Sequence, residues 1–292
     1  MKISNFNKGI ISSSSGSIWW GFLGTFYFQF VSFAGTMEVV VHRCIWTSVI
    51  LLVSTFLFKK WYLLIAIFKN KKKVFYLLLT SLLIFGNWTV WIYAVTNDQI
   101  IDASYGYFIF PILSVLLGRF FFKEKLNKLR VISVIIVIFA STLMLLNMYN
   151  FPFAGFAVAV LWSTYNLIRK KINVDTDVGL LIESLFILPL ALVIFYFIVI
   201  NNHNDFTFQN PKIMLLLFLA GPMTVIPLFL YVKGVQLCGI GPSGMIFFIT
   251  PFGQFLLGYF YFNEPFSNIK FLSFVLIWIA VFIYLKDLYE NN

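Results

Sequence analysis

Charged residues are scarce in this chain of 292 residues: only 11% are Asp, Glu, Lys or Arg, whereas 61% are hydrophobic. A soluble domain has about 25% charged residues, because water must wet its surface. The mean hydropathy of +0.91 leaves too little polar surface for such a domain. This shortage excludes an ordinary soluble fold and predicts a protein whose surface faces lipid.

Cysteine and histidine are also scarce, with two of each. Cys44 and Cys238 fall inside apolar segments, where packing in the core is expected rather than a disulfide or a metal site. The histidines lack the spacing of metal ligands, and no phosphate-binding loop of the Walker type is present. We therefore expect no metal, no cofactor, no ATP hydrolysis and no enzymatic activity.

Long apolar runs are abundant instead. A helix needs about 20 apolar residues to cross a bilayer, and backbone groups in lipid must be hydrogen-bonded within the protein. Ten segments meet this length approximately and are expected to be helices, which predicts an all-α polytopic membrane protein. The segments are 9–31, 38–58, 74–96, 102–122, 129–148, 152–169, 179–200, 212–233, 242–262 and 268–286.

Basic residues cluster in short loops between these segments and give a formal net charge of +10. They do not form one basic face, so nucleic-acid binding is not expected. With a cytoplasmic N-terminus, most of the 21 Lys and Arg residues lie on the cytoplasmic side, whereas Lys212 and Lys270 lie outside. Cytoplasmic loops carry an excess of Lys and Arg. We therefore expect a multi-pass protein of the bacterial inner (cytoplasmic) membrane with both termini in the cytoplasm.

An internal repeat relates the fourth and ninth segments. An offset of 140 residues aligns Glu124 with Glu264 and Pro111 with Pro251. Each half then holds five helices, so the second half starts on the opposite side of the membrane and is inverted. Inverted repeats are typical of secondary transporters, with the substrate site near the midplane between the halves. A duplicated membrane scaffold without transport is the alternative. The predicted repeats span 9–148 and 152–286.

Charged side chains within the second segment need an explanation, because each costs about 2.5–3.5 kcal/mol in the bilayer centre. Glu38 and His42 are four residues apart and share a helix face, and Arg43 follows. Glu38 and His42 are candidates for an ion pair or for coupling. Either these residues extend to the interface, or they form a polar entrance in which Arg43 contacts a substrate carboxylate.

Polar and aromatic residues also occupy the third and fourth segments. Asn87 lies near the middle of its segment and is followed by Trp88. An amide at this depth either bonds to a neighbouring helix or lines a cavity. Asp102 lies at the outer end of the fourth segment, as a candidate coupling carboxylate, and Tyr107 lies further in.

Three prolines are candidates for helix breaks or gating. Proline removes a backbone hydrogen bond, and mirrored helix irregularities indicate a binding site in transporters with repeats. Pro111 and Pro251 are related by the repeat, and Gln254 lies just below Pro251. The third proline is Pro227.

The second half has its own buried polar residues. Trp162 and Tyr165 lie in the sixth segment, and Glu183 lies about one turn into the seventh. Glu183 either carries a proton or forms a salt bridge with Arg169 or Lys170.

Taken together, these residues resemble the RarD-type permeases of the EamA group of the drug/metabolite transporter superfamily, roughly over 17–286. One departure is Phe247-Phe248, where the family tends to carry Gln-Tyr shortly before the proline. The strings that carry the resemblance are Trp20-Gly21, Tyr27-Phe28, Glu38…His42-Arg43…Trp46, Asn87-Trp88, Ala103-Ser104…Gly106-Tyr107-Phe108…Pro111, Tyr165…Arg169-Lys170, Glu183…Pro189, Ile226-Pro227-Leu228 and Gln254-Phe255-Leu256…Glu264-Pro265.

The resemblance implies ten helices in two inverted repeats around a central cavity, and export or exchange by alternating access. We therefore predict a secondary-active carrier for small organic metabolites such as amino acids, S-adenosylmethionine or amphiphilic drugs. Protons or a counter-exchanged metabolite would drive it. A membrane enzyme or a lipid flippase acting on a lipid-linked substrate is the alternative. The candidate substrate-binding residues are Arg43, Asn87, Trp88, Tyr107, Trp162, Tyr165 and Gln254.

Overall fold

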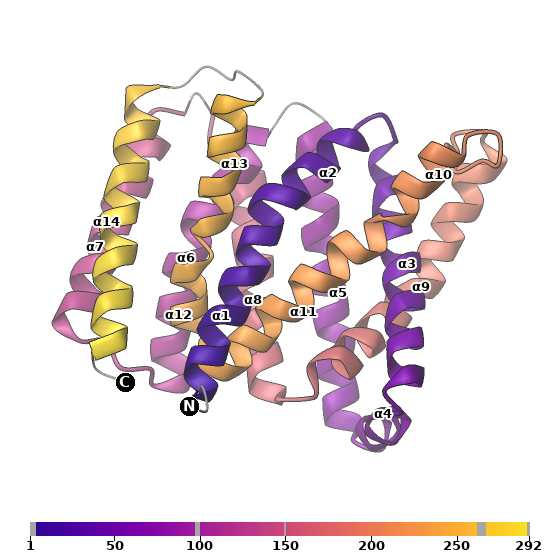
Figure 1. Cartoon of the computed structure of the whole chain (residues 1–292), viewed down its shortest axis with the longest axis horizontal. Coiled ribbons are helices and arrows are strands. Elements are labelled where there is room, and N and C mark those ends of the chain that lie inside the picture. Colours follow the sequence, from indigo (N-terminus) through magenta and orange to yellow (C-terminus); the bar gives the residue numbers. More distant parts are fainter. Residues whose placement is uncertain (1–3, 97–99, 149, 262–266, 291–292) are drawn as a thin grey trace.

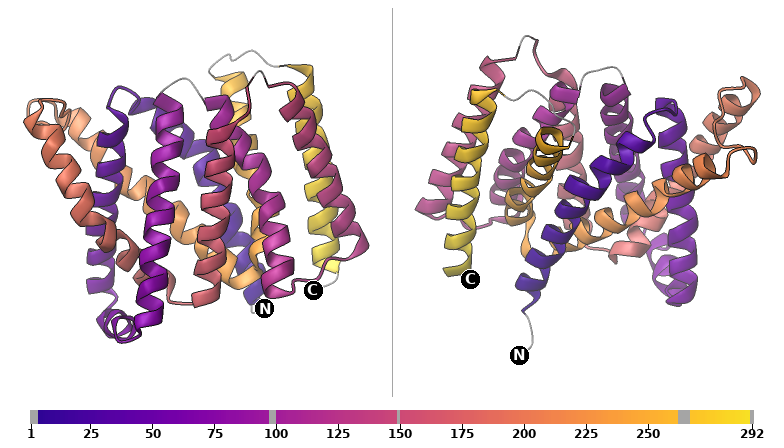
Figure 2. Two further views of the ribbon diagram at one scale, coloured as in Figure 1. Left: turned by 180° about the vertical axis from the view of Figure 1, so that it is seen from behind. Right: turned by 45° about the horizontal axis from the view of Figure 1, so that its top comes forward.

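The computed structural model shows a bundle of helices (Figure 1). It describes residues 4–96, 100–148, 150–261 and 267–290, and within these ranges the chain has no strand. The predicted all-α class is confirmed. Along the longest axis of the bundle, α7 and α14 lie at one end and α9 and α10 lie at the other (Figures 1 and 2).

The helical elements follow the apolar runs closely. They are α1 Asn5–Ile18, the π-helix η1 Trp19–Gly24, α2 Thr25–Phe30, α3 Thr36–Leu57, α4 Trp61–Phe68, α5 Lys71–Thr96, α6 Ile100–Phe122, α7 Lys128–Leu146, α8 Phe153–Ile172, α9 Thr176–Ile200, α10 Pro211–Phe218, α11 Ala220–Cys238, α12 Ile240–Ile246, α13 Ile249–Phe260 and α14 Asn268–Glu290.

Eight helical segments of the described chain are long and apolar enough to cross a membrane. The protein is therefore a multi-pass membrane protein. Of the ten predicted spans, the first is divided among α1, η1 and α2, and the sixth corresponds to α8. Both are helical, and the count of ten spans stays a prediction.

The helices pack in a regular set of pairs. Helix α1 packs on α11, α5 on α8, α3 on α9 and α7 on α14, while α6 lies between α8 and α12. Figure 1 shows α1 and α11 crossing obliquely through the middle of the bundle. Each of these pairs joins a helix from the first half of the chain, residues 4–148, to a helix from the second half, residues 150–290. The core therefore depends on contacts between the halves.

Small residues allow α1 and α11 to approach closely. A β-carbon added to Gly9 would lie 2.7 Å from the β-carbon of Cys238, and one added to Gly16 would lie 2.9 Å from the carbonyl oxygen of Pro227. Close approach through glycine and serine is a common way to pack helices in membranes. Ser13 adds a hydroxyl contact of 2.9 Å with Ser243 of α12.

Both termini lie at the same end of the bundle, which we call the terminal side (Figure 1). Here Lys60 Nζ donates to both oxygens of Asp177 at 2.8 Å and to Asp175 at 3.2 Å. Burial lowers the pKa of Lys60, but the hydrogen bonds to these two carboxylates outweigh burial and raise the pKa above its ordinary value. The Lys60 ammonium therefore stays charged and joins the end of α3 to the start of α9.

Glu124 makes a second contact at the terminal side. Its carboxylate accepts hydrogen bonds from the backbone N–H groups of Ile240 and Gly241, both at 2.9 Å, at the start of α12. Lys170 Nζ lies 3.7 Å from the same carboxylate. The chain can turn here because Gly239, with φ 111°, separates α11 from α12. We refer to the Lys60 and Glu124 contacts together as the terminal-side ties.

A buried ion pair joins α7 to α14 at the same side. Arg130 Nε donates to Asp287 Oδ2 at 2.6 Å, and both side chains are almost fully buried. Breaking such a pair by removing one partner costs about 3–5 kcal/mol, because it leaves an uncompensated charge. This pair is therefore a stable connection between the two helices.

We expect Gly9→Val to destabilise the protein. The added side chain would force α1 away from Cys238, and overpacking of this kind costs about 1–3 kcal/mol. The midpoint of thermal unfolding in detergent should fall. Ile11→Val on the exposed face of the same helix is the matched control and should leave the midpoint unchanged. Equal midpoints for the two variants would contradict the close packing.

Candidate functional site

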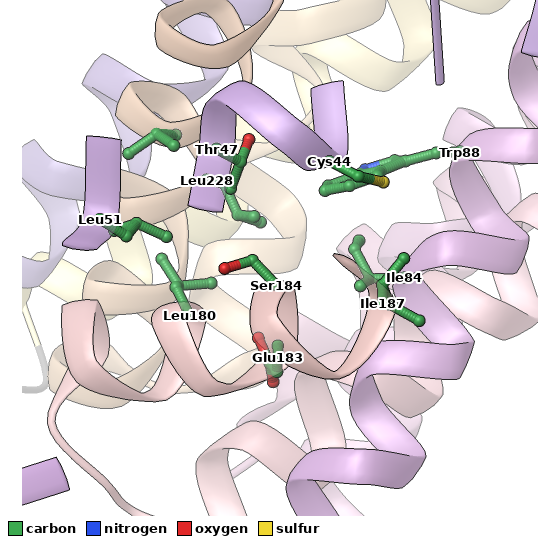
Figure 3. Close-up of a pocket in the computed structure, with 11 residues that line it drawn as sticks. Cys44, Thr47, Leu51, Ile84, Trp88, Leu180, Glu183, Ser184, Ile187 and Leu228 are labelled. Atoms are coloured by element: carbon green, nitrogen blue, oxygen red, sulfur yellow. The ribbon is translucent and has the colours of Figure 1, made fainter. Parts of the chain in front are cut away.

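A pocket lies between α3, α5, α9 and α11 (Figure 3). Its volume is about 20 Å³, counted as the space open to the centre of a water molecule. One water needs about 10–15 Å³ on this measure, so the pocket has room for one or two waters at most and is too small for an organic solute. The residues that line it are Cys44, Thr47, Leu51, Ile84, Trp88, Leu180, Glu183, Ser184, Ile187, Val225 and Leu228.

Glu183 of α9 supplies the charge in the pocket lining. Figure 3 shows its carboxylate below Ser184, away from Cys44 and Trp88. The carboxylate accepts hydrogen bonds from Thr80 Oγ1 at 2.5 Å and from the Tyr165 hydroxyl at 3.1 Å. These bonds hold the side chain against α5 and α8 at one end of the pocket.

Arg169 is the ion-pair partner of Glu183, with 3.5 Å between Arg169 Nε and Glu183 Oε1. The arginine is fully buried, and its Nη2 donates to the carbonyl oxygen of Thr176 at 3.1 Å. Gly179 of α9 makes room for it, since an added β-carbon there would lie 2.8 Å from Arg169 Cζ. Of the two partners that the sequence allowed for Glu183, the structure has Arg169.

Arg43 of α3 lies beside the opposite end of the pocket. Its Nε donates to Thr224 Oγ1 of α11 at 3.0 Å, and its guanidinium lies 4.6 Å from the ring centre of Trp88 and 5.0 Å from that of Phe28. The Thr224 hydroxyl itself donates to Ala220 O, so its oxygen is oriented to accept. Arg43 is only 5% exposed. Trp88 thus links the arginine to the pocket.

An aromatic cluster drawn mainly from η1, α6, α8 and α11 shares one packed core with the pocket residues. The Trp162 and Tyr165 rings are stacked, with centroids 5.2 Å apart, and Tyr107 meets Phe247 at 5.5 Å. These rings belong to the same packed core as the pocket residues Leu51, Ile84, Leu180, Val225 and Leu228. The cluster consists of Trp20, Tyr107, Phe110, Trp162, Tyr165, Tyr231 and Phe247.

The other predicted binding residues lie outside the pocket lining. Asn87 is buried and its Nδ2 donates to Val158 O of α8 at 3.0 Å, so it bonds to a neighbouring helix. Gln254 is half-buried in α13 and is not among the lining residues. The structure thus brings together Trp88 and Glu183 around the pocket, with Arg43 and the aromatic residues next to it.

Glu38 and His42 have local partners near the loop that follows α9. Glu38 Oε1 accepts from the backbone N–H groups of Asp205 and Phe206, at 2.8 and 3.2 Å. His42 Nδ1 accepts from Trp46 Nε1 at 3.2 Å, and the His42 Nε2 lies 3.8 Å from Glu38. These contacts fasten the loop to α3.

None of the three prolines marks the position of a helix break in the described residues. Helices α6 and α11 continue through Pro111 and Pro227, so the predicted breaks there are absent. The ninth predicted segment is interrupted at Phe247-Phe248, between α12 and α13. Pro251 lies in the first turn of α13, where a backbone N–H would make no hydrogen bond within the helix, so proline costs none there. Both Pro111 and Pro227 are packed against a neighbouring helix: a β-carbon on Gly244 would lie 3.6 Å from Pro111 Cα, and one on Gly16 would lie 2.9 Å from the carbonyl oxygen of Pro227.

Some contributors were not apparent from the sequence. Thr80 and Thr224 hold the charged side chains of Glu183 and Arg43, and Thr47 brings a hydroxyl to the pocket. Threonine is common in apolar helices, so the type of residue alone carried no signal. Asp102 lies outside the residues whose side chains the structure describes.

Helices that can cross a membrane, packed around a small internal pocket with buried charged side chains at its ends, define the class: a multi-pass membrane protein with a mostly apolar internal pocket. Two stretches of the chain, residues 7–146 and 152–286, match the EamA-like transporter family. The chain belongs to this family. The resemblance to RarD-type permeases is also confirmed by its relatives, and the chain is a membrane transporter of the drug/metabolite transporter type.

Two relatives illustrate the similarity. An uncharacterized transporter of Vibrio cholerae serotype O1 is 32% identical over 280 residues, covering 96% of this chain and 92% of the relative. Protein RarD of Escherichia coli K12 is 29% identical over 288 residues, covering 98% of this chain and 97% of the relative. A solved structure with 14% identity has a TM-score of 0.70 and covers 94% of each chain, which shows the fold alone.

We expect Arg169→Met to lower the midpoint of thermal unfolding, because it leaves the Glu183 carboxylate buried without its cation. Removing one partner of a buried pair costs about 3–5 kcal/mol. The double variant Arg169→Met, Glu183→Gln should recover part of the loss. Glu290→Gln, in the exposed pair with Lys286, is the control and should have no effect. An Arg169→Met variant as stable as the parent would contradict the assigned pair.

Proposed function

We propose that the chain is a secondary-active carrier that moves small organic metabolites across the bacterial inner membrane by alternating access. The observation that carries the proposal is the pocket between α3, α5, α9 and α11, which has buried charges at both ends and lies between helices of the two halves. Membership of the EamA-like transporter family supports it. The pocket, Arg43 and the aromatic cluster would form the solute path.

The proposed organisation is two inverted five-helix repeats, at 9–148 and 152–286. The pairs of packed helices support it. An inverted repeat exchanges the first segment with the sixth and the third with the eighth, and the pairs α1–α11 and α5–α8 are equivalent under this exchange. The pairs α3–α9 and α7–α14 each join equivalent segments. A two-fold axis in the membrane plane would produce such pairs.

Alternating access requires that the terminal side open and close. Both terminal-side ties join the first half of the chain to the second, Lys60 to Asp175 and Asp177, and Glu124 to Ile240 and Gly241. Together with the small pocket, they support a conformation that is closed on the terminal side. The excess of basic residues supports a cytoplasmic location for this side.

Energy coupling is proposed to use protons or a counter-exchanged metabolite. Glu183 is the favoured coupling carboxylate in the described part of the chain, because it lines the pocket and has a hydrogen-bonded network around it. Asp102 stays a second candidate from the sequence.

Transport by the purified protein in proteoliposomes tests the proposal. The solutes should include amino acids, S-adenosylmethionine and amphiphilic drugs, each measured with and without an imposed proton gradient and with and without internal solute for exchange. We expect at least one solute to move faster than in protein-free vesicles. If lipid-linked probes were translocated or modified while every solute stayed at the background rate, a flippase or an enzyme would replace the carrier.

We further expect that locking the terminal side stops transport. Lys60→Cys and Asp175→Cys place thiols at two residues that are about a third exposed, in a background with Cys44→Ala and Cys238→Ala. A short bis-thiosulfonate reagent should join α3 to α9 and reduce uptake to the rate of protein-free vesicles, and dithiothreitol should restore it.

The matched control places both cysteines on one helix, at Lys286 and Glu290 of α14. Cross-linking within α14 constrains no other helix, so uptake should continue. Full activity of the protein locked between α3 and α9 would contradict opening at the terminal side.

A further inference from the structure

Buried arginines in this protein have two kinds of surroundings. Arg130 and Arg169 each lie beside a carboxylate, that of Asp287 at 2.6 Å and that of Glu183 at 3.5 Å. Arg43 is buried to the same degree as Arg130, with 5% of its surface exposed. Among the carboxylates that the structure describes, none lies within 4 Å of Arg43.

Neighbouring side chains contact the guanidinium group of Arg43 at its Nε and through two aromatic rings. Thr224 accepts from Nε, and the rings of Phe28 and Trp88 lie against the group. A guanidinium has five N–H donors and stays charged at all physiological pH values. Its two terminal nitrogens, Nη1 and Nη2, form a fork that can donate two parallel hydrogen bonds to one carboxylate, a bidentate contact. The hydrogen bond that the structure gives Arg43 within the described residues is the one from Nε to Thr224.

A second donor lies one turn further along the same helix. Thr47 lines the pocket, is buried, and its Oγ1 has no hydrogen-bond partner among the described residues. Residues four apart share a helix face, so Arg43 and Thr47 are on the same side of α3. Trp88 is common to both environments, because it contacts the guanidinium and lines the pocket. Buried polar groups need partners, and an acceptor at this end of the pocket would serve both residues.

The rest of the pocket favours an apolar body. Most of the lining is aliphatic, and Glu183 at the other end is already neutralised by Arg169. Helix α5 spans the distance between the two ends of the pocket, because its Thr80 contacts Glu183 and its Trp88 contacts Arg43. Thr80 and Trp88 are eight residues apart, which is about 12 Å along the helix axis. An α-ammonium group of a small amino acid held at Arg43 would therefore not reach Glu183. The aliphatic lining residues are Leu51, Ile84, Leu180, Ile187, Val225 and Leu228.

We infer that the solutes are organic monocarboxylates with an apolar body, bound through the carboxylate by Arg43 and Thr47, and that they are preferred over zwitterions and neutral analogues. This inference rests on the proposed carrier function and names the substrate class of its site. The pocket is closed at about 20 Å³, so the apolar body is accommodated when the helices around it separate.

Three matched compounds test the preference. 3-Phenylpropionate has a carboxylate and a phenyl group. L-Phenylalanine adds an α-ammonium group, and 3-phenylpropanamide has a neutral amide in place of the carboxylate. Binding is measured on the full-length protein in detergent by the rise in the unfolding midpoint and by the tryptophan fluorescence of the protein. Transport of the labelled compounds is measured in proteoliposomes. We expect 3-phenylpropionate to bind and be transported at least about tenfold better than either analogue, a ratio that corresponds to 1.4 kcal/mol.

Two substitutions at Arg43 assign the effect to this residue. Arg43→Lys keeps the charge but loses the fork, and should weaken binding of 3-phenylpropionate about tenfold or more. Arg43→Met should abolish it while leaving the weak binding of the amide unchanged. Arg119→Met removes an exposed arginine of α6 as the matched control and should bind as the parent does. The unfolding midpoint without solute shows that each variant is folded.

The outcomes separate the inference from the proposed function. Equal binding and transport of the amide, or of phenylalanine, would overturn the monocarboxylate preference while leaving a carrier. Binding of 3-phenylpropionate that survives in both Arg43 variants would overturn the assigned site. Chloride alone giving the same fluorescence change and displacing the carboxylate from the parent protein would make the site one for inorganic anions and overturn the organic class. Transport of other solutes but none of these three would also overturn the inference, whereas no transport of any solute would overturn the carrier itself.

Discussion

A guanidinium group buried among apolar helices must be neutralised or hydrogen-bonded, because it cannot lose its proton and its transfer from water is costly. Three buried arginines are subject to this constraint, and each contacts a residue of another part of the helix bundle. Arg130 joins α7 to α14, Arg169 fixes Glu183 at the pocket, and Arg43 joins α3 to α11 through Thr224. Two of them lie beside carboxylates of the protein, Arg130 beside Asp287 and Arg169 beside Glu183. The third has hydrogen-bonding capacity at the edge of the pocket.

The polar contacts at the terminal side differ in how much free energy is needed to break them, which indicates which helices can move apart. Lys60 with Asp175, and Lys170 with Glu124, are partly exposed, and exposed ion pairs contribute about 0–1 kcal/mol. The Arg130–Asp287 pair is buried and costs several times more to break. In the proposed transport cycle the terminal-side ties would therefore part, while α7 and α14 would stay paired.

The sequence was most informative where the signal is summed over many residues. Composition and the apolar runs predicted the all-α membrane class, and the residues of the resemblance predicted the family. The boundaries of α3 and α14 differ from the predicted segments by a few residues. Each of these features follows from the solvation of whole segments in lipid, which does not depend on how one helix is rotated against another.

The site depends on rotation and on single partners, so less of it could be predicted. Glu183 had Arg169 and Lys170 as possible partners, and only the packing of α9 on α8 selects Arg169. Thr224 could not be assigned to Arg43, because the two are 181 residues apart in the chain. The break at Phe247-Phe248 was expected at the prolines themselves, but helices continue through proline when neighbouring helices hold both sides.

The most direct measurement of the central claim is the distance across the terminal side in lipid. Spin labels at Tyr62 of α4 and Tyr289 of α14, both exposed, report this distance by pulsed electron paramagnetic resonance. We expect two distance populations in liposomes, a short one for the closed conformation and a longer one for the open conformation, with a ratio that changes when a transported solute is added. A single distance that no solute or proton gradient alters would contradict alternating access.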